Sequence, residues 1–130
     1  MTSKQAVFIG TLALMAVFTL PRFTHAENPN TRVVRLAALE IDPARVEQYK
    51  AALREEISSS IRLEPGVITL YAVSVKNHPE QVRLFEMYAD QAAYESHIQS
   101  VHFKRYKAET QSMVRSLTLL ETDPILLGSK

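Results

Sequence analysis

The sequence predicts an α+β domain in which one four-stranded antiparallel sheet carries helices on a single face. Segments typical of strands and helices alternate as strand, helix, strand, and this order occurs twice. A short polar turn separates the two middle strands, which favours a hairpin. Two such halves make the ferredoxin-like sandwich. The chain has 130 residues, 46% of them hydrophobic, which suits one domain with one core.

The first half begins with a strand over Thr31–Ile41, which is rich in β-branched and aliphatic residues. Asp42 and Pro43 follow, an N-cap residue and a proline suited to the first helical position. Apolar residues then recur at three- and four-residue steps, as on one face of a helix that runs to about Leu63: Val46, Tyr49, Leu53, Ile57 and Ile61. Glu64-Pro65-Gly66 ends this helix, because proline disfavours helix before it.

The second half contains the hairpin and the remaining helices. Val67–Val75 and Gln81–Ala89 have the composition of strands, and we place their turn at Lys76–Glu80. Asp90 caps a helix from about residue 91, which runs or breaks near residue 100 before a second helical piece over 101–113. Val114–Thr122 is the last strand.

The second strand is apolar on both faces. Its odd positions carry Val, Thr, Tyr, Val and Val, and its even positions carry Ile, Leu, Ala and Ser. Helices cover one face of the sheet, and a strand with its other face in water would alternate more cleanly. We therefore expect a homodimer with the sheets packed face to face. A ligand cavity between sheet and helices would take up part of the apolar excess.

Residues 1–26 have the three-part pattern of a secretory signal peptide. Lys4 gives a basic start, Ala6–Leu20 is an uncharged apolar run, and Thr24–Ala26 puts small residues before a cut. The run is shorter than the ~20 residues that span a bilayer, which argues against the alternative of an uncleaved anchor. We expect cleavage after Ala26, a mature domain over 27–130, and a periplasmic or secreted protein without stable membrane anchoring.

Composition excludes several classes of function. Cleavage would leave 13 of the 15 basic residues against all 14 acidic ones, a net charge of −1. Such a balance gives no electrostatic reason to expect binding to nucleic acid or to anionic membranes. The chain has no cysteine, so disulfides, thiolate nucleophiles and cysteine-ligated zinc are excluded.

His97 and His102 lie five residues apart among aromatic residues. On a straight helix they would point about 140° apart, whereas metal-binding pairs on one helix use a four-residue step. A break near residue 100 would reorient them, but no third ligand is evident, so we predict no metal site. Each histidine is either a partly buried side chain packed on an aromatic or a proton donor or acceptor near neutral pH.

Glu86 is unusual because it lies mid-strand between Phe85 and Met87, with Tyr88 two places on and on the same face. Glutamate is seldom buried without a partner. It is either an edge residue in water, a partner of an arginine such as Arg35 or Arg115, or a cavity carboxylate that orients His97.

Several short motifs, taken together in order and spacing, resemble the antibiotic biosynthesis monooxygenase (ABM) domain family over about Arg32 to Glu121. The matching motifs are Glu64-Pro65-Gly66, Phe85-Glu86-Met87-Tyr88, Asp90, Ala93-Tyr94, His97 and His102-Phe103. The resemblance implies a ferredoxin-like fold of the dimeric α/β barrel type, with a cavity between sheet and helices. Val101 departs from the family pattern, which usually has proline before this histidine.

Members of that family include cofactor-free monooxygenases on quinols and polyketide aromatics, and the resemblance implies such an activity on a quinol or phenolic small molecule. His97 would be the base, Glu86 its orienting partner, and Tyr88 or Tyr71 a hydrogen-bond donor. Substrate-binding residues are predicted at Tyr71, Tyr94, His102 and Phe103. No cofactor is expected. The alternatives are an isomerase or other proton-transfer enzyme, a haem-degrading enzyme, and a non-catalytic module that binds a small apolar ligand.

Overall fold

The computed structural model describes residues 31–129, so the predicted signal peptide lies outside the described residues. The elements are, in chain order, β1 (Val33–Ile41), the 3-10 helix η2 (Pro43–Arg45), α1 (Val46–Leu63), β2 (Val67–Val75), β3 (His78–Tyr88), α2 (Gln91–Gln99), α3 (Val101–Thr110) and β4 (Val114–Thr122). Among the residues described, no helix is both long enough and apolar enough to span a bilayer.

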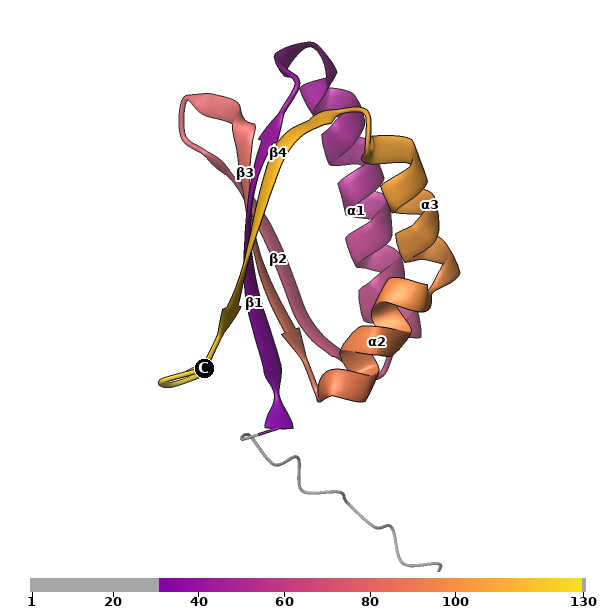
Figure 1. The fold of residues 1–130 in the computed structure, drawn as a ribbon, viewed down its shortest axis with the longest axis vertical. Helices are drawn as coiled ribbons and strands as arrows, with labels where there is room; N and C mark the ends of the chain where they lie inside the picture. Colours follow the sequence, from indigo (N-terminus) through magenta and orange to yellow (C-terminus); the bar gives the residue numbers. More distant parts are fainter. Residues whose placement is uncertain (1–30, 130) are drawn as a thin grey trace, which may run out of the picture.

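The strands form a sheet of order β2-β3-β1-β4 in which every neighbouring pair is antiparallel. Helices α1, α2 and α3 all lie on one face of this sheet (Figure 1). The architecture confirms the predicted ferredoxin-like α+β fold.

The core lies between the helix-facing side of β1 and α1. Ala37, Leu39 and Ile41 alternate along β1, and each is at most 3% exposed. They pack with Tyr49 and Leu53 from the apolar stripe of α1. Burying one such aliphatic side chain contributes about 1.5–3 kcal/mol, so this stripe fixes α1 on the sheet.

Several boundaries differ from the sequence prediction, among them the hairpin turn and the end of α3. The hairpin turn is only Lys76 and Asn77, and Val75 already pairs with His78. Asn77 has φ 65°, a left-handed conformation that asparagine tolerates, so the turn needs fewer residues than the five we predicted. Helix α3 ends at Thr110 rather than near residue 113, because Met113 is fully buried in the core.

The sheet face opposite the helices carries a row of large apolar side chains. The strand registers align Tyr71, Phe85, Leu36 and Leu120 across β2, β3, β1 and β4. Tyr71 is 68% exposed and Leu120 is 54% exposed. The two-sided apolar character expected of β2 is therefore present, and it extends across the whole sheet.

Gly66 allows β2 to begin close to α2. A Cβ atom at this position would lie 2.5 Å from the Cβ of Ala93, which is closer than side-chain atoms approach. We predict that Gly66→Ala lowers the free energy of unfolding by about 1–3 kcal/mol, the usual cost of overpacking. Urea unfolding followed by circular dichroism measures this.

The matched control is Gly128→Ala, because a Cβ there meets no atom within 4 Å. Its unfolding midpoint should equal that of the wild type. A Gly66→Ala protein as stable as the control would show that α2 shifts freely on the sheet.

Candidate functional site

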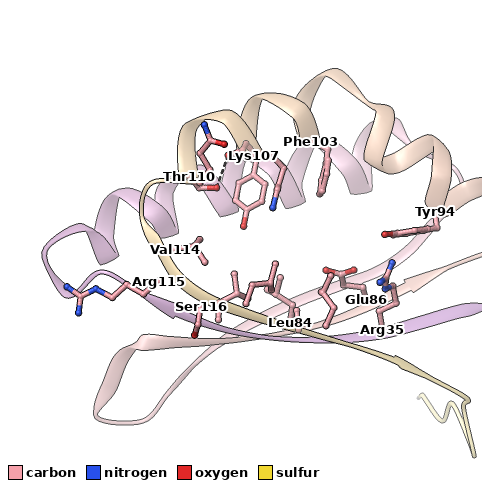
Figure 2. A pocket seen from close by; sticks show the side chains of 16 residues that line it. Arg35, Leu84, Glu86, Tyr94, Phe103, Lys107, Thr110, Val114, Arg115 and Ser116 are labelled. Atoms are coloured by element: carbon pink, nitrogen blue, oxygen red, sulfur yellow. Dashed lines mark hydrogen bonds between the residues drawn. The ribbon is translucent and has the colours of Figure 1, made fainter.

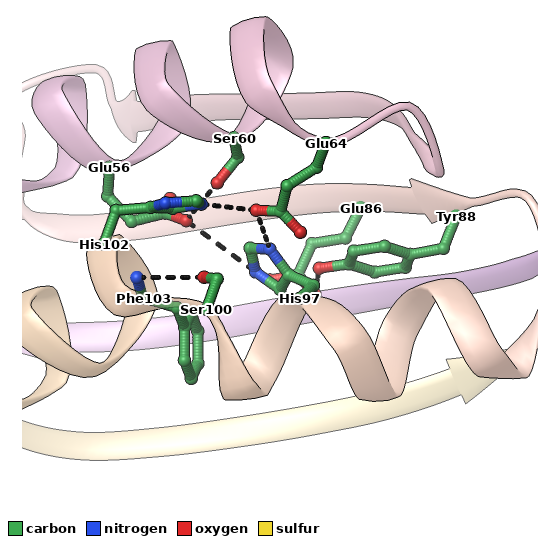
Figure 3. A network of polar contacts seen from close by, with 9 residues as sticks. All are labelled: Glu56, Ser60, Glu64, Glu86, Tyr88, His97, Ser100, His102 and Phe103. Carbon is green, nitrogen blue, oxygen red and sulfur yellow. Dashed lines mark hydrogen bonds and ion pairs between the residues drawn. The ribbon is translucent and has the colours of Figure 1, made fainter.

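A buried polar cluster joins α1 to the junction between α2 and α3 (Figure 3). Glu56 and Ser60 lie one helical turn apart on α1, and Glu64 follows at the same four-residue step just beyond its end. This spacing places all three side chains on one side of the helix. His97 comes from the last turn of α2 and His102 from the first turn of α3.

Glu64 is the centre of this cluster. Nδ1 of His97 lies 3.1 Å from Oε1 of Glu64, and Nε2 of His102 bonds the same oxygen. Ser60 donates a hydrogen bond of 2.7 Å to Oε1 of Glu56, which lies 3.7 Å from Nε2 of His97. His97 is 3% exposed and Glu56 is 6% exposed.

The break at Ser100 brings the two histidines together. Ser100 has ψ 151°, which ends α2, and its hydroxyl accepts the N–H of Phe103 as the N-cap of α3. The chain therefore changes direction between His97 and His102, and both rings reach Glu64. Val101 occupies the first position of α3, where proline is favoured. The helix break does not require that proline, because the Ser100 cap starts α3 by itself.

The pKa values of the two glutamates of the cluster are shifted in opposite directions. Burial raises the pKa of Glu56, and the Ser60 hydrogen bond only partly opposes this effect. Burial also acts to raise the pKa of Glu64, but the hydrogen bonds from His102 and His97 outweigh it and hold that pKa below its usual value. Glu64 is therefore a carboxylate that accepts hydrogen bonds from both rings.

Glu86 and Tyr88 form a second polar pair on the helix-facing side of β3. The Tyr88 hydroxyl donates a 3.1 Å hydrogen bond to Oε2 of Glu86. Burial raises the pKa of Glu86, and the opposing effects of Tyr88, His97 and Arg35 are smaller. Burial likewise raises the pKa of Tyr88 above its ordinary range. A carboxyl group of raised pKa next to a neutral phenol suits general acid–base chemistry.

Arg35 lies opposite Glu86 in the strand register. Its guanidinium is stacked 4.4 Å over the ring of Tyr94 and makes an ion pair of 3.6 Å with Glu121. Arg115, the other arginine considered as a partner of Glu86, instead pairs with Asp42 at 3.2 Å. A positive charge and an aromatic ring therefore lie beside Glu86.

A cavity of about 360 Å³ lies between the sheet and α3, and Glu86, Arg35, Tyr94 and Phe103 contribute to its wall (Figure 2). This size falls within the range of small-molecule sites. His97 does not line it. His97 and Glu86 instead share a pocket of only about 30 Å³ next to Phe103, whose ring centre is 4.8 Å from that of His97.

The structure brings some of the predicted site residues together and separates others. Glu86, Tyr94 and Phe103 line the large cavity, and Tyr88 touches it only through Glu86. His102 instead lines a different groove on the outer side of the helices.

Tyr71 lies on the sheet face away from the helices, where its ring stacks on Phe85 at 6.5 Å, although it also borders the small pocket. Glu86 was expected to orient His97, but the hydrogen bond that the structure shows for His97 is to Glu64. Glu56 and Glu64 were missed as site residues. Their four-residue spacing with Ser60 was the available signal.

Residues 32–109 match the family model described as antibiotic biosynthesis monooxygenase. A solved structure from Bacteroides thetaiotaomicron, described as a candidate antibiotic biosynthesis monooxygenase, is 50% identical, with 79% of this chain and 98% of that chain covered and a TM-score of 0.76. The chain belongs to the antibiotic biosynthesis monooxygenase family.

Two further ABM-like structures agree in fold. One from Lactobacillus acidophilus, described as a candidate monooxygenase, is 30% identical over 69% of this chain and 43% of that one, with a TM-score of 0.68. One from Nitrosomonas europaea is 18% identical, with 74% of this chain and 92% of that chain covered and a TM-score of 0.69. It supports the fold alone. A search of curated proteins finds no match.

The raised pKa of Glu86 predicts that this residue costs stability at neutral pH. Its folded-state pKa lies above the unfolded value, so the cost is absent below the unfolded pKa, grows between the two values, and is complete above the folded pKa. Glu86→Gln should therefore raise the melting temperature at pH 8 by roughly 2–5 °C. The gain should disappear near pH 4, which thermal melts at both values would measure.

Glu80→Gln makes the same chemical change on β3, at a side chain that lies outside the large cavity and pairs with His78. It should shift the melting temperature by only about 1 °C at either pH. Destabilisation by Glu86→Gln at pH 8 would contradict the assignment of a strained carboxyl group.

Proposed function

We propose that this ABM-family protein is a cofactor-independent monooxygenase that oxidises a small phenol or quinol in the 360 Å³ cavity. The observation that carries the proposal is Glu86, a half-buried carboxyl group of raised pKa on the wall of an aromatic-lined cavity. A carboxylate whose pKa is raised is a stronger base than an ordinary glutamate. The likeness to structures described as candidate monooxygenases supports the reaction class.

The protein's task in this reaction is to make the substrate anion. Glu86 accepts the proton of the substrate, and the electron-rich anion then passes electrons directly to O₂. One oxygen atom enters the ring as a carbonyl and the other leaves as water, so the substrate supplies every electron that O₂ takes up. The cationic side chains of Arg35 and Lys107 in the cavity wall favour the anion.

The aromatic residues position the substrate. Tyr94 and Phe103 offer ring faces to a planar molecule, and Tyr88 holds the Glu86 carboxyl through its hydroxyl. His97 does not line the large cavity, so we assign the role of base to Glu86. His97 acts only through its electrostatic effect on the pKa of Glu86.

The test is oxygen uptake with a panel of phenols, hydroquinones and anthrones, with mass spectrometry of products formed under ¹⁸O₂. Glu86→Gln should reduce kcat by about 10²–10⁴, the usual contribution of a general base. Glu80→Gln, the matched change outside the cavity, should retain wild-type turnover. Full turnover by a folded Glu86→Gln protein would refute this role.

We also propose that the protein is a homodimer joined through the exposed sheet face. Val73 lies on this face and is 60% exposed, and Tyr71, two residues before it on the same face, is 68% exposed. Val73→Lys should weaken the dimer at least about tenfold, because it would bury an unpaired charge. Light scattering over a dilution series measures the dissociation.

Ile61→Lys is the control, since Ile61 is a 50% exposed aliphatic residue on α1, on the helix side of the molecule. This variant should remain dimeric. A wild-type protein that is monomeric at micromolar concentration would exclude the proposed dimer.

Export is the remaining part of the proposal, and it rests on the pattern of residues 1–26. Protein recovered from the native cell envelope or medium should begin at Glu27, as N-terminal sequencing or intact mass would measure. Recovery of the chain with Met1 to Ala26 attached, in the membrane fraction, would instead indicate an anchor.

A further inference from the structure

The cluster around His97 and His102 is not used by the proposed oxygenation. Glu56, His97 and His102 contribute nothing to the wall of the large cavity. Yet each of the three can direct one nitrogen or oxygen atom into a common space, where these atoms all lie within 4.8 Å of one another. Two of the three residues are buried, so the arrangement differs from a solvated group of surface charges.

His97 directs one ring nitrogen to Glu64 and the other to Glu56. Nδ1 of His97 lies 3.1 Å from Oε1 of Glu64. Nε2 of His97 faces Oε1 of Glu56 at 3.7 Å. This separation is longer than a hydrogen bond, and an imidazole nitrogen and a carboxylate oxygen are both ligands of zinc. A cation between them would satisfy both.

The distances and the surrounding contacts suit such a cation. Ligand atoms around a tetrahedral zinc ion lie about 3.3 Å apart, given bonds of about 2.0–2.1 Å. The His97–Glu56 pair therefore needs to close by about 0.4 Å, and the widest pair of the three by up to about 1.5 Å, a change within the reach of side-chain rotation at the partly exposed His102. Metal-bound histidines usually donate their second ring N–H to a carboxylate, and Glu64 fills that place for His97. Ser60 likewise fixes the Glu56 carboxylate by its 2.7 Å hydrogen bond.

We propose that Glu56, His97 and His102 bind one divalent transition-metal ion, of which Zn²⁺ is the best fit, with Glu64 and Ser60 orienting the ligands. Two imidazoles and one carboxylate match the preference of zinc, whereas Mg²⁺ and Ca²⁺ require oxygen ligands. The positive ion also balances the carboxyl groups of the buried Glu56 and the partly buried Glu64.

The site has an entrance and a structural consequence. His102 borders an outer groove of about 250 Å³, which gives an ion access from solvent on the side away from the large cavity. The ligands come from α1, α2 and α3, so the metal cross-links all three helices and stabilises the folded chain. The sequence argument against a metal assumed that no third ligand lies nearby, and Glu56 supplies it.

The test uses purified protein without a polyhistidine tag, stripped with a chelator and dialysed. Calorimetric titration with ZnCl₂ should give one ion per chain, and the melting temperature should rise with zinc but not with MgCl₂. Co²⁺ should give the visible absorption of a low-coordinate nitrogen and oxygen site. Glu56→Gln and His102→Ala should each weaken zinc binding at least tenfold.

The control is His78→Ala, because His78 lies next to the β2–β3 turn, outside the cluster, and its side chain is 58% exposed. It should bind zinc as the wild type does. Circular dichroism establishes that each variant is folded. If Glu56→Gln does not fold, His102→Ala provides the test, because the His102 side chain is partly exposed. The proposal is overturned if the wild type binds no zinc at one per chain, or if His78→Ala loses binding as much as His102→Ala does.

Discussion

The carboxylate of Glu64 is the contact on which the arrangement of the helices depends. It follows the last turn of α1, precedes the start of β2, and accepts hydrogen bonds from both His97 and His102. Two charge-assisted hydrogen bonds offset the cost of taking this carboxylate out of water, which is why it stays ionised. Because one oxygen atom joins three helix ends, α2 and α3 must meet at a fixed angle, and Ser100 supplies the break that allows it.

This junction also positions the large cavity. Phe103 follows His102 directly, so fixing His102 on Glu64 fixes the aromatic wall between the buried cluster and the cavity. On the opposite wall, Leu117 and Leu119 lie on the helix side of β4, but they are 42% and 47% exposed. The helices therefore leave the cavity open at the β4 edge.

The two polar centres of the domain have different physical characters. Around Glu64 two histidine rings make hydrogen bonds to one carboxylate, so the ionised form is favoured. Around Glu86 the effect of burial prevails over the opposing effects of Tyr88, His97 and Arg35, so the pKa of its carboxyl group is raised. The first arrangement stabilises the fold, whereas the second costs stability in exchange for a carboxyl group that can take up a proton. Fold membership alone would not distinguish them, because function resides in the site.

Signals that act over a few neighbouring residues could be read from the sequence. The apolar stripe of α1 and the two-sided strand β2 were predicted correctly, since backbone periodicity depends on nearby residues. Asp42 is a cap as predicted, but it caps the 3-10 helix η2, and α1 begins only at Val46. The hairpin turn was predicted too long because one left-handed asparagine was sufficient. The end of α3 was placed too late because the burial of Met113 is a tertiary effect.

The site was decided by the tertiary structure. The sequence indicated that Glu86, His97 and His102 were chemically interesting, but not which of them face a common space. Glu64 had the properties of a helix terminator in the sequence, and only the packing of α1 against the α2–α3 junction makes it the partner of two histidines. Contacts between residues more than thirty positions apart depend on how helices pack, and no local pattern encodes their distance. The sequence by itself determined the elements and their order, and the packing of helices on the sheet determined which side chains meet.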